Sequence, residues 1–275
     1  MPEAPTRARV ADSATADDLI IMLLGLEMAH AISKSLQNLR PNYPASQINI
    51  HKLTPDGRSW VLHAKHFMPV DDADMQTLWA ARPIEVTSGV IMGKTIPFPR
   101  RTAAFGVDYK YTGQTQLSHP EEAAPAPIRE RVAELRHGVE EFSIHNAMLV
   151  NWYEACNGEY MGAHSDDETA LRGNEPIVSM SWASRGHYRR FRFTAKKHVA
   201  DALIPDWGDK PGVMRLYNGC LVVMGGQCQK THKHELMKPT KALGESEGRR
   251  INLTLRAFGE KATQESKKRM RQEGD

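Results

Sequence analysis

The sequence lacks the features of secreted and membrane-spanning proteins. It has only three cysteines in 275 residues and no C-x-x-C pair, which excludes a disulfide framework and favours a reducing compartment. The strongest apolar run, residues 19–32, is shorter than the ~20 residues of a membrane helix and contains Glu27 and His30. Asp17 and Asp18 precede it, where a signal peptide would carry basic residues. We therefore expect a soluble intracellular protein of the nucleus or cytoplasm, with no membrane partner.

A large excess of charge is absent as well. Charged residues make up 25% of the chain and the formal net charge is +3, as in ordinary soluble globular proteins. This mild positive charge permits a polyanionic partner without requiring one. The 40% of hydrophobic residues suffices for the core of one large domain, or of one domain with an extension.

The residue pattern changes near position 146. Before it, helical spacing of apolar residues predicts helices over 16–39, 71–79 and 128–139. After it, the chain reads as short strands separated by turn-rich loops, at residues 148–153, 160–164, 177–182, 190–194, 214–217, 221–224 and 251–258. Such a series predicts a sandwich, jelly roll or barrel.

These changes suggest four segments. Residues 1–14 are rich in proline, alanine and arginine and are predicted to be disordered. Residues 15–95 are interpreted as an N-terminal extension with an amphipathic helix, and residues 96–258 as the main domain. Residues 259–275 form a charged tail without aromatics. The basic cluster in this tail is compatible with a nuclear signal or, more simply, with a solvated surface.

His164-Ser165-Asp166 is the first group that can carry metal chemistry. In an extended segment, positions i and i+2 point the same way, so the imidazole and the carboxylate can converge. His232 and His234 follow later and are also two residues apart. Two histidines and one carboxylate form the facial set of Fe(II) oxygenases. A polar strand end would carry the same residues, and spacing alone admits either distal histidine.

Residues 250–256 alternate between an apolar and a polar face. Ile251, Leu253 and Leu255 form the apolar face, and the polar face consists of Arg250, Asn252, Thr254 and Arg256. If both faces were buried, the two guanidiniums would need an anion. A dicarboxylate such as 2-oxoglutarate would offer each of them a partner. An edge strand with a solvated polar face is the alternative.

Asn151 and Tyr153 share one face of a third strand and could hydrogen-bond the same anion. What matters is the order of these features along the chain. The Asn/Tyr strand comes first, then H-x-D, a serine-rich strand, a glycine-rich hairpin, a histidine and the arginine strand.

In this order the chain resembles the AlkB family of Fe(II)/2-oxoglutarate-dependent dioxygenases, from about residue 97 to 256. The matching segments are PRRTAAFG at 99–106, YKYTG at 109–113, NWY at 151–153, HSDDE at 164–168, PIVSMS at 176–181, FRF at 191–193, NGCLVVMGG at 218–226, His234 and RINLTLR at 250–256. The resemblance implies a mainly β fold with flanking helices (α+β) around a double-stranded β-helix, or jelly roll. It also implies Fe(II) as metal cofactor, with 2-oxoglutarate and O2 as co-substrates.

The resemblance assigns roles residue by residue. By position, His164, Asp166 and His234 look like the iron ligands. Arg250 and Arg256 look like the clamps of the 2-oxoglutarate carboxylates, and Asn151, Tyr153 and Asn252 complete that pocket.

On the substrate side, Tyr111 lies where the family stacks an aromatic ring on a flipped base, and Glu168 where a carboxylate faces the exocyclic amine. Arg101 and Arg189 are expected to contact phosphates. Two departures leave substrate choice open. The loop at 182–188 is about three residues longer than usual. The first 90 residues, where the resemblance implies a possible substrate lid within the extension 15–95, match the family poorly.

The reaction implied is oxidative removal of alkyl groups from nucleic-acid bases such as N1-methyladenine or N3-methylcytosine, in alkylated DNA or RNA. It would release succinate, CO2 and formaldehyde, and we expect a monomeric enzyme. One alternative keeps the iron and 2-oxoglutarate but acts on a protein, lipid or small molecule. Another is a non-enzymatic zinc or nucleic-acid-binding module that uses Cys228, His232 and His234.

Overall fold

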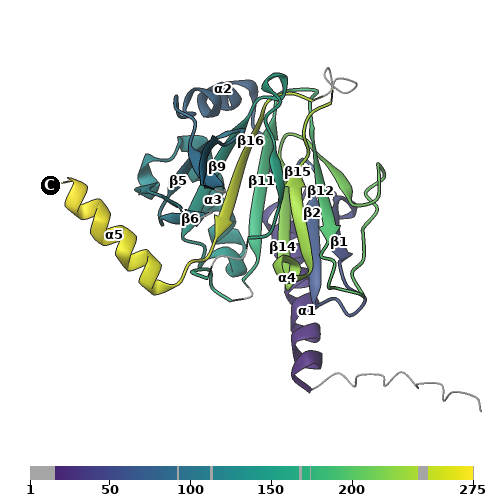
Figure 1. Ribbon diagram of the computed structural model, residues 1–275. Helices are drawn as coiled ribbons and strands as arrows, with labels where there is room; N and C mark the ends of the chain where they lie inside the picture. The colour runs from purple at the N-terminus through teal and green to yellow at the C-terminus, as the bar shows by residue number, and fades with distance from the viewer. Residues whose placement is uncertain are drawn as a thin grey trace, which may run out of the picture.

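Two β-sheets form the centre of the protein (Figure 1). The computed structural model describes residues 16–91, 93–111, 114–166, 169–173, 175–240 and 247–274. The larger sheet has eight strands, in the order β1 (Ile48–Lys52), β2 (Ser59–Ala64), β14 (Cys220–Gly226), β11 (Ile177–Ala183), β16 (Arg250–Arg256), β9 (Ala147–Tyr153), β5 (Arg101–Phe105) and β8 (Ser118–His119). Its neighbours pair antiparallel except β5 and β8.

The smaller sheet has four strands, in the order β10 (Met161–His164), β15 (His232–Leu236), β12 (Arg189–Ala195) and β13 (Val213–Leu216). Two short hairpins stand apart from both sheets, β3 (Ser88–Ile91) with β4 (Lys94–Pro97) and β6 (Tyr109–Tyr111) with β7 (Gln114–Gln116).

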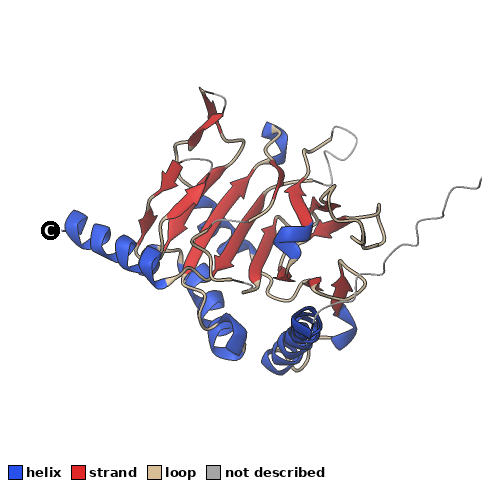
Figure 2. Ribbon diagram, turned by 60° about the horizontal axis from the view of Figure 1, so that its bottom comes forward, coloured by secondary structure: helices blue, strands red, loops and turns tan. Residues whose placement is uncertain are grey.

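Helices cover one face of the larger sheet. They are α1 (Ala16–Leu39), α2 (Asp72–Ala80) and α3 (Ala126–Gly138), and Figure 2 shows two long helices lying together on one side of the strands. Ile32 of α1, Leu78 of α2 and Leu135 of α3 belong to the same buried cluster as sheet residues such as Leu253. The other α-helices among the described residues are the single turn α4 (Cys228–Thr231) and α5 (Glu260–Gly274).

The opposite face of the larger sheet packs against the smaller sheet. A second buried cluster joins Ile177 and Val222 of the larger sheet to Phe193, Met214 and Leu236 of the smaller one. Because side chains alternate along a strand, each central strand contributes one set of residues to the helices and the other to the space between the sheets. Two facing sheets with flanking helices are the arrangement expected of a jelly roll.

Most predicted elements lie where the residue pattern placed them. The helix predicted over 16–39 is α1, and the one over 71–79 is α2, whose N-cap Asp71 accepts a hydrogen bond from the Asp74 amide at 2.8 Å. Strand β2, which lies within the predicted extension, pairs with β14. The charged tail forms helix α5. Within the described ranges, no helix combines the length and apolar character needed to cross a membrane.

Candidate active site

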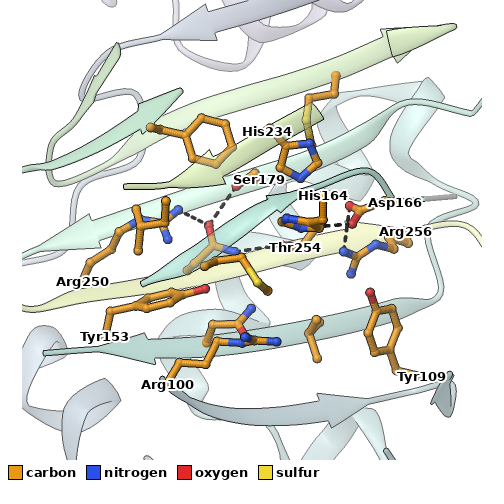
Figure 3. Close-up of a pocket in the computed structure, with 17 residues that line it drawn as sticks. Arg100, Tyr109, Tyr153, His164, Asp166, Ser179, His234, Arg250, Thr254 and Arg256 are labelled. Atoms are coloured by element: carbon orange, nitrogen blue, oxygen red, sulfur yellow. Dashed lines mark hydrogen bonds and ion pairs between the residues drawn. The ribbon is translucent and has the colours of Figure 1, made fainter. Parts of the chain in front are cut away.

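The cavity between the two sheets receives the polar face of β16 (Figure 3). All seven residues of β16 are buried, because β11 and β9 flank it, the helices cover one of its faces and the smaller sheet covers the other. Ile251, Leu253 and Leu255 pack toward the helices. The alternate residues, Arg250, Asn252, Thr254 and Arg256, line the cavity. The alternative of a solvated edge strand is therefore excluded.

Three acid–base side chains converge at one end of this cavity. His164 ends β10, Asp166 follows two residues later, and His234 lies in the neighbouring strand β15, directly opposite His164. One ligand atom from each lies within 4.8 Å of the others. The rings of His164 and His234 have centroids 4.3 Å apart. The pairing of β10 with β15 thus brings together residues seventy positions apart.

His232 hydrogen-bonds to residues outside this group. This distinguishes it from His234, the other candidate for the distal metal ligand. Its Nδ1 lies 2.9 Å from Thr231 Oγ1 and its Nε2 lies 3.0 Å from the Leu203 carbonyl. Cys228 is fully buried, and that burial raises the pKa of its thiol, with the charge of Asp166 adding to the effect. A thiolate ligand is therefore disfavoured. In the part of the chain that the structure describes, the group of His164, Asp166 and His234 is the one arrangement suited to a metal, so nothing supports a zinc module.

The donor atoms fit a divalent iron. Asp166 is 3% exposed, and its Oδ1 is buried with no hydrogen-bond partner, so this oxygen is available to an ion or a water. The His164 Nδ1–H donates to the Gly162 carbonyl at 2.8 Å, so its Nε2, 3.7 Å from Asp166 Oδ1, keeps the lone pair. Two imidazoles and a carboxylate that leave open positions suit Fe(II).

The electrostatics hold these groups in ligand form. Burial by itself would raise the pKa of Asp166, but the charges of Arg256, His234 and His164 outweigh it and lower that pKa well below the usual range of a carboxyl. Burial, with the charge of His164 adding, lowers the pKa of His234 to about 3. At neutral pH the site therefore presents a carboxylate and a neutral imidazole, the forms that bind a metal.

Buried cations surround the rest of the cavity. Arg100, Arg250 and Arg256 line it, against the single carboxylate of Asp166. Arg256 donates to Asp166 Oδ2 at 2.8 Å. Arg250 donates from Nε and Nη2 to Ser181 Oγ at 3.1 and 2.9 Å, and its burial lowers its pKa to about 10.

Among the described residues, no carboxylate forms an ion pair with Arg250. A buried guanidinium that is held only by neutral partners would gain from an anion. The cavity is thus suited to an anionic ligand beside the three acid–base side chains.

The family follows from the sequence comparison. The pattern of the 2OG-Fe(II) oxygenase superfamily matches residues 73–256, well over half of the chain. The chain belongs to the 2OG-Fe(II) oxygenase superfamily. Membership bears out the predicted jelly-roll fold and implies Fe(II), 2-oxoglutarate and O2 for this oxygenase, as the sequence predicted.

Individual relatives agree with the AlkB resemblance. The DNA oxidative demethylase ALKBH2 of Homo sapiens is 28% identical over 171 residues, covering 60% of this chain and 59% of the human protein. The protein of the same name from Mus musculus is 28% identical over 170 residues, covering 60% and 64%. The oxygenase thus spans less than two thirds of the length of these curated relatives. The predicted resemblance to the AlkB family is confirmed.

Two solved structures also align with the oxygenase. One is described as the structure of OsALKBH1, with 19% identity and a TM-score of 0.39 over 71% of this chain and 97% of that one. The other is an oxidoreductase of the 2OG-Fe(II) oxygenase family from Burkholderia pseudomallei, with 14% identity and a TM-score of 0.43 over 71% and 84%.

The structure brings most of the predicted site residues together. The cavity of the oxygenase is lined by the predicted iron ligands and by all five residues predicted for 2-oxoglutarate, Asn151, Tyr153, Arg250, Asn252 and Arg256. They are joined by hydrogen bonds, because Asn252 Oδ1 accepts from Ser179 Oγ at 2.8 Å and also from Arg250. The guanidinium of Arg250 also lies 5.4 Å from the ring centroid of Tyr153.

The predicted substrate contacts are placed less favourably. Arg189 is fully buried and donates to the carbonyls of Glu159 and Met237 at 2.6 and 3.2 Å, so it does not face a phosphate. Arg101 lies outside the cavity, 3.6 Å from a carboxylate oxygen of Glu159. Glu168 and the side chain of Tyr111 lie outside the described residues.

Three further residues touch the site, although the sequence did not assign them to it. Arg100 lines the cavity and donates from Nε to Asn151 Oδ1 at 3.0 Å. Tyr109 also lines it and precedes Tyr111 by two positions, so strand alternation alone could have identified it. Gln229 accepts a hydrogen bond from the Asp166 amide at 2.9 Å, and no pattern in the sequence indicates this.

Proposed function

We propose that this oxygenase removes alkyl groups oxidatively from N-alkylated bases of DNA or RNA. The observation that carries the proposal is the cavity itself. It places a buried two-histidine, one-carboxylate group beside guanidiniums that have no carboxylate except Asp166 among the lining residues. The similarity to proteins named DNA oxidative demethylase supports the class of substrate.

In this proposal each residue of the cavity has a definite task. His164, Asp166 and His234 hold Fe(II), which when bound with 2-oxoglutarate and O2 supplies the oxidising power that hydroxylates an N-alkyl carbon and leads to release of succinate, CO2 and formaldehyde. Arg250, held in place by its hydrogen bonds to Ser181, would bind a carboxylate of 2-oxoglutarate. Asn252, Asn151 and Tyr153 orient the same molecule.

Arg256 and Tyr109 form the wall of the cavity nearest the iron ligands. The guanidinium of Arg256 lies over the Tyr109 ring at 4.9 Å and donates to Asp166. It thereby fixes the Asp166 carboxylate and leaves Oδ1 for the metal. An aromatic wall beside the metal suits a flat substrate, since a base leaves its stack to reach a buried site and binds by stacking.

The test is turnover by protein reconstituted with Fe(II) under anaerobic conditions. Succinate and formaldehyde are measured after O2 and 2-oxoglutarate are added, with oligonucleotides that carry N1-methyladenine or N3-methylcytosine and with unmodified oligonucleotides of the same sequence. We expect both products in equal amounts, and only with the methylated strands. His164→Ala should abolish them, with His198→Ala, an exposed histidine, as the matched control.

Two outcomes would redirect the proposal. Succinate without loss of the methyl group would retain the oxygenase and move the search to protein, lipid or small-molecule substrates. No succinate from metal-replete protein would reject the enzymatic role. Binding to the methylated oligonucleotide should also weaken steeply with salt, as phosphate contacts require.

The remaining expectations stay predictions. We propose a monomer, and light scattering would test this. A nuclear or cytoplasmic location and the boundaries of the catalytic domain at 96–258 also remain to be tested.

A further inference from the structure

One face of helix α5 lies against the chain that enters hairpin β6–β7. Ala262, Ser266 and Arg269 recur at helical spacing on this face. Ala262 packs against a buried cluster that includes Tyr109 and Phe258, and Ser266 is 1% exposed. The neighbouring Lys267 and Lys268 are exposed. The helix therefore has a docking face, although its composition is that of a solvated tail.

The docking contacts converge on Asp108, the residue before β6. The Asp108 amide donates to Ser266 Oγ at 2.9 Å. Arg269 donates from Nη2 to Asp108 Oδ1 at 2.7 Å and from Nε to Oδ2 at 3.1 Å, which is the bidentate geometry of a strong ion pair. Both partners are mostly buried, with side-chain exposures of 20% and 16%.

The same contacts tie the two ends of the hairpin together. Asp108 Oδ1 accepts from the amide and the hydroxyl of Ser118, each at 2.8 Å, and Arg269 donates to the Ser118 carbonyl at 2.6 Å. Burial alone would raise the pKa of Asp108, but the hydrogen bonds from Arg269 and Ser118 outweigh it and lower that pKa. Hairpin β6–β7 lies between these two tied residues.

The hairpin carries residues of the candidate active site. Tyr109 follows Asp108 directly, is 6% exposed and lines the cavity. Its ring lies 4.9 Å from the guanidinium of Arg256, which donates to Asp166. Tyr111, the residue predicted to stack on the base, ends strand β6. A continuous set of contacts thus runs from α5 to the proposed iron ligand.

We propose that helix α5, through Arg269, positions hairpin β6–β7 against the cavity and thereby sets the affinity for the nucleic-acid substrate. The effect on substrate rests on the proposed function, whereas the docking of the hairpin does not. A hairpin that is already docked binds substrate without first being ordered. Arg269 is a positioning residue, because it acts on the site through its contacts with Asp108 and Ser118.

The first test is amide hydrogen exchange over residues 106–119. Arg269→Ala should speed exchange there. Arg269→Lys keeps the charge but loses the bidentate pairing with Asp108, and it should give an intermediate rate. Arg271→Ala changes an exposed arginine on the same helix and should leave the rate unchanged. If Arg269→Ala fails to fold, the lysine variant still decides. Unchanged exchange in folded Arg269 variants overturns the proposal, whatever the substrate of the enzyme proves to be.

The second test is kinetic. If Arg269→Ala reduces the docked population to about one tenth, the KM for a methylated oligonucleotide rises about tenfold. The kcat and the KM for 2-oxoglutarate should stay within about twofold, because β16 and the iron ligands are untouched. In an Asp108→Asn background, Arg269→Ala should add little further effect. A parallel fall in kcat, or an unchanged oligonucleotide KM, would contradict the role in substrate binding.

Discussion

Arg250 shows how a single residue marks the anion site. It is buried in the centre of the larger sheet, and its bonds to Ser181 and Asn252 orient the guanidinium without neutralising it. The anion that would neutralise it is proposed to be 2-oxoglutarate. The residue is therefore a sensitive point at which to test the cavity.

We predict that Arg250→Lys raises the KM for 2-oxoglutarate by roughly 30-fold or more, because weakening one partner of a buried charge pair costs about 2–5 kcal/mol. The KM is measured by succinate release. Arg249→Lys is the matched control, since the preceding side chain points away and pairs with Glu154 at the surface. Equal KM values for the two variants would remove Arg250 from the co-substrate site.

The surroundings of Asp166 allow a second quantitative prediction. Asp166→Asn keeps the size of the side chain but removes the charge that Arg256 pairs with at 2.8 Å. We expect affinity for Fe(II), or for Mn(II) as a probe, to fall more than about 100-fold, as measured by anaerobic titration calorimetry. Asp209→Asn, at an exposed position, should bind metal normally. Retained metal binding in Asp166→Asn would contradict the ligand assignment.

At the scale of the element, strand β16 contributes both to the stability of the fold and to the candidate active site. Its inward residues line the cavity, while Leu253 is fully buried against the helices. We predict that Leu253→Ala lowers the free energy of unfolding by about 2–5 kcal/mol, because it leaves a void in a packed core. Urea unfolding measures this, and Leu117→Ala, at a side chain that is 52% exposed, should change stability little. A change of similar size in both variants would argue against close packing at Leu253.

Several of the strands that the sequence predicted have apolar alternation or continuous apolar runs. β9, β11, β14 and β16 are of this kind, and each has a face packed against the helices or the smaller sheet. Strand β15 was not predicted, because two of its three inward residues are His232 and His234. Because these buried residues are polar, the sequence of β15 does not show the alternation of hydrophobic and polar residues that indicates a strand.

The parts of the candidate site that consist of short, continuous sequence motifs could be predicted. H-x-D and the arginine strand could be identified because strand alternation brings their side chains to one face. Arg189 was misjudged as a phosphate contact because burial by distant segments does not show in the local sequence. The role of α5 was invisible for the same reason, since Asp108 and Arg269 are 161 positions apart.

At the scale of the whole molecule, buried histidines link stability to pH. Burial, with the charges of His51, Lys65 and His66 adding to it, lowers the pKa of His63 from 6.5 to about 4. Between these values the unfolded chain binds a proton that the folded chain does not. Stability from this group is therefore complete above about pH 6.5 and declines as the pH falls toward about 4.

We predict that His63 contributes up to about 3 kcal/mol to this decline. His63→Gln should flatten the dependence of unfolding free energy on pH between about 4 and 6.5, measured by urea titration at several pH values. His198→Gln, at an exposed position, should leave the slope as it is. A slope that His63→Gln does not change would show that the other buried histidines account for the effect.

The position of β16 also bears on when the protein can fold. It is the last of the described strands in chain order, yet it lies in the middle of the larger sheet and joins β11 to β9. Until residue 256 has left the ribosome, the sheet consists of two unconnected halves, β1–β2–β14–β11 and β9–β5–β8. The last of the described strands to be synthesised therefore joins the halves and brings the two arginines into the cavity. A nascent chain that ends before β16 can neither close this sheet nor present Arg250 and Arg256 to the co-substrate.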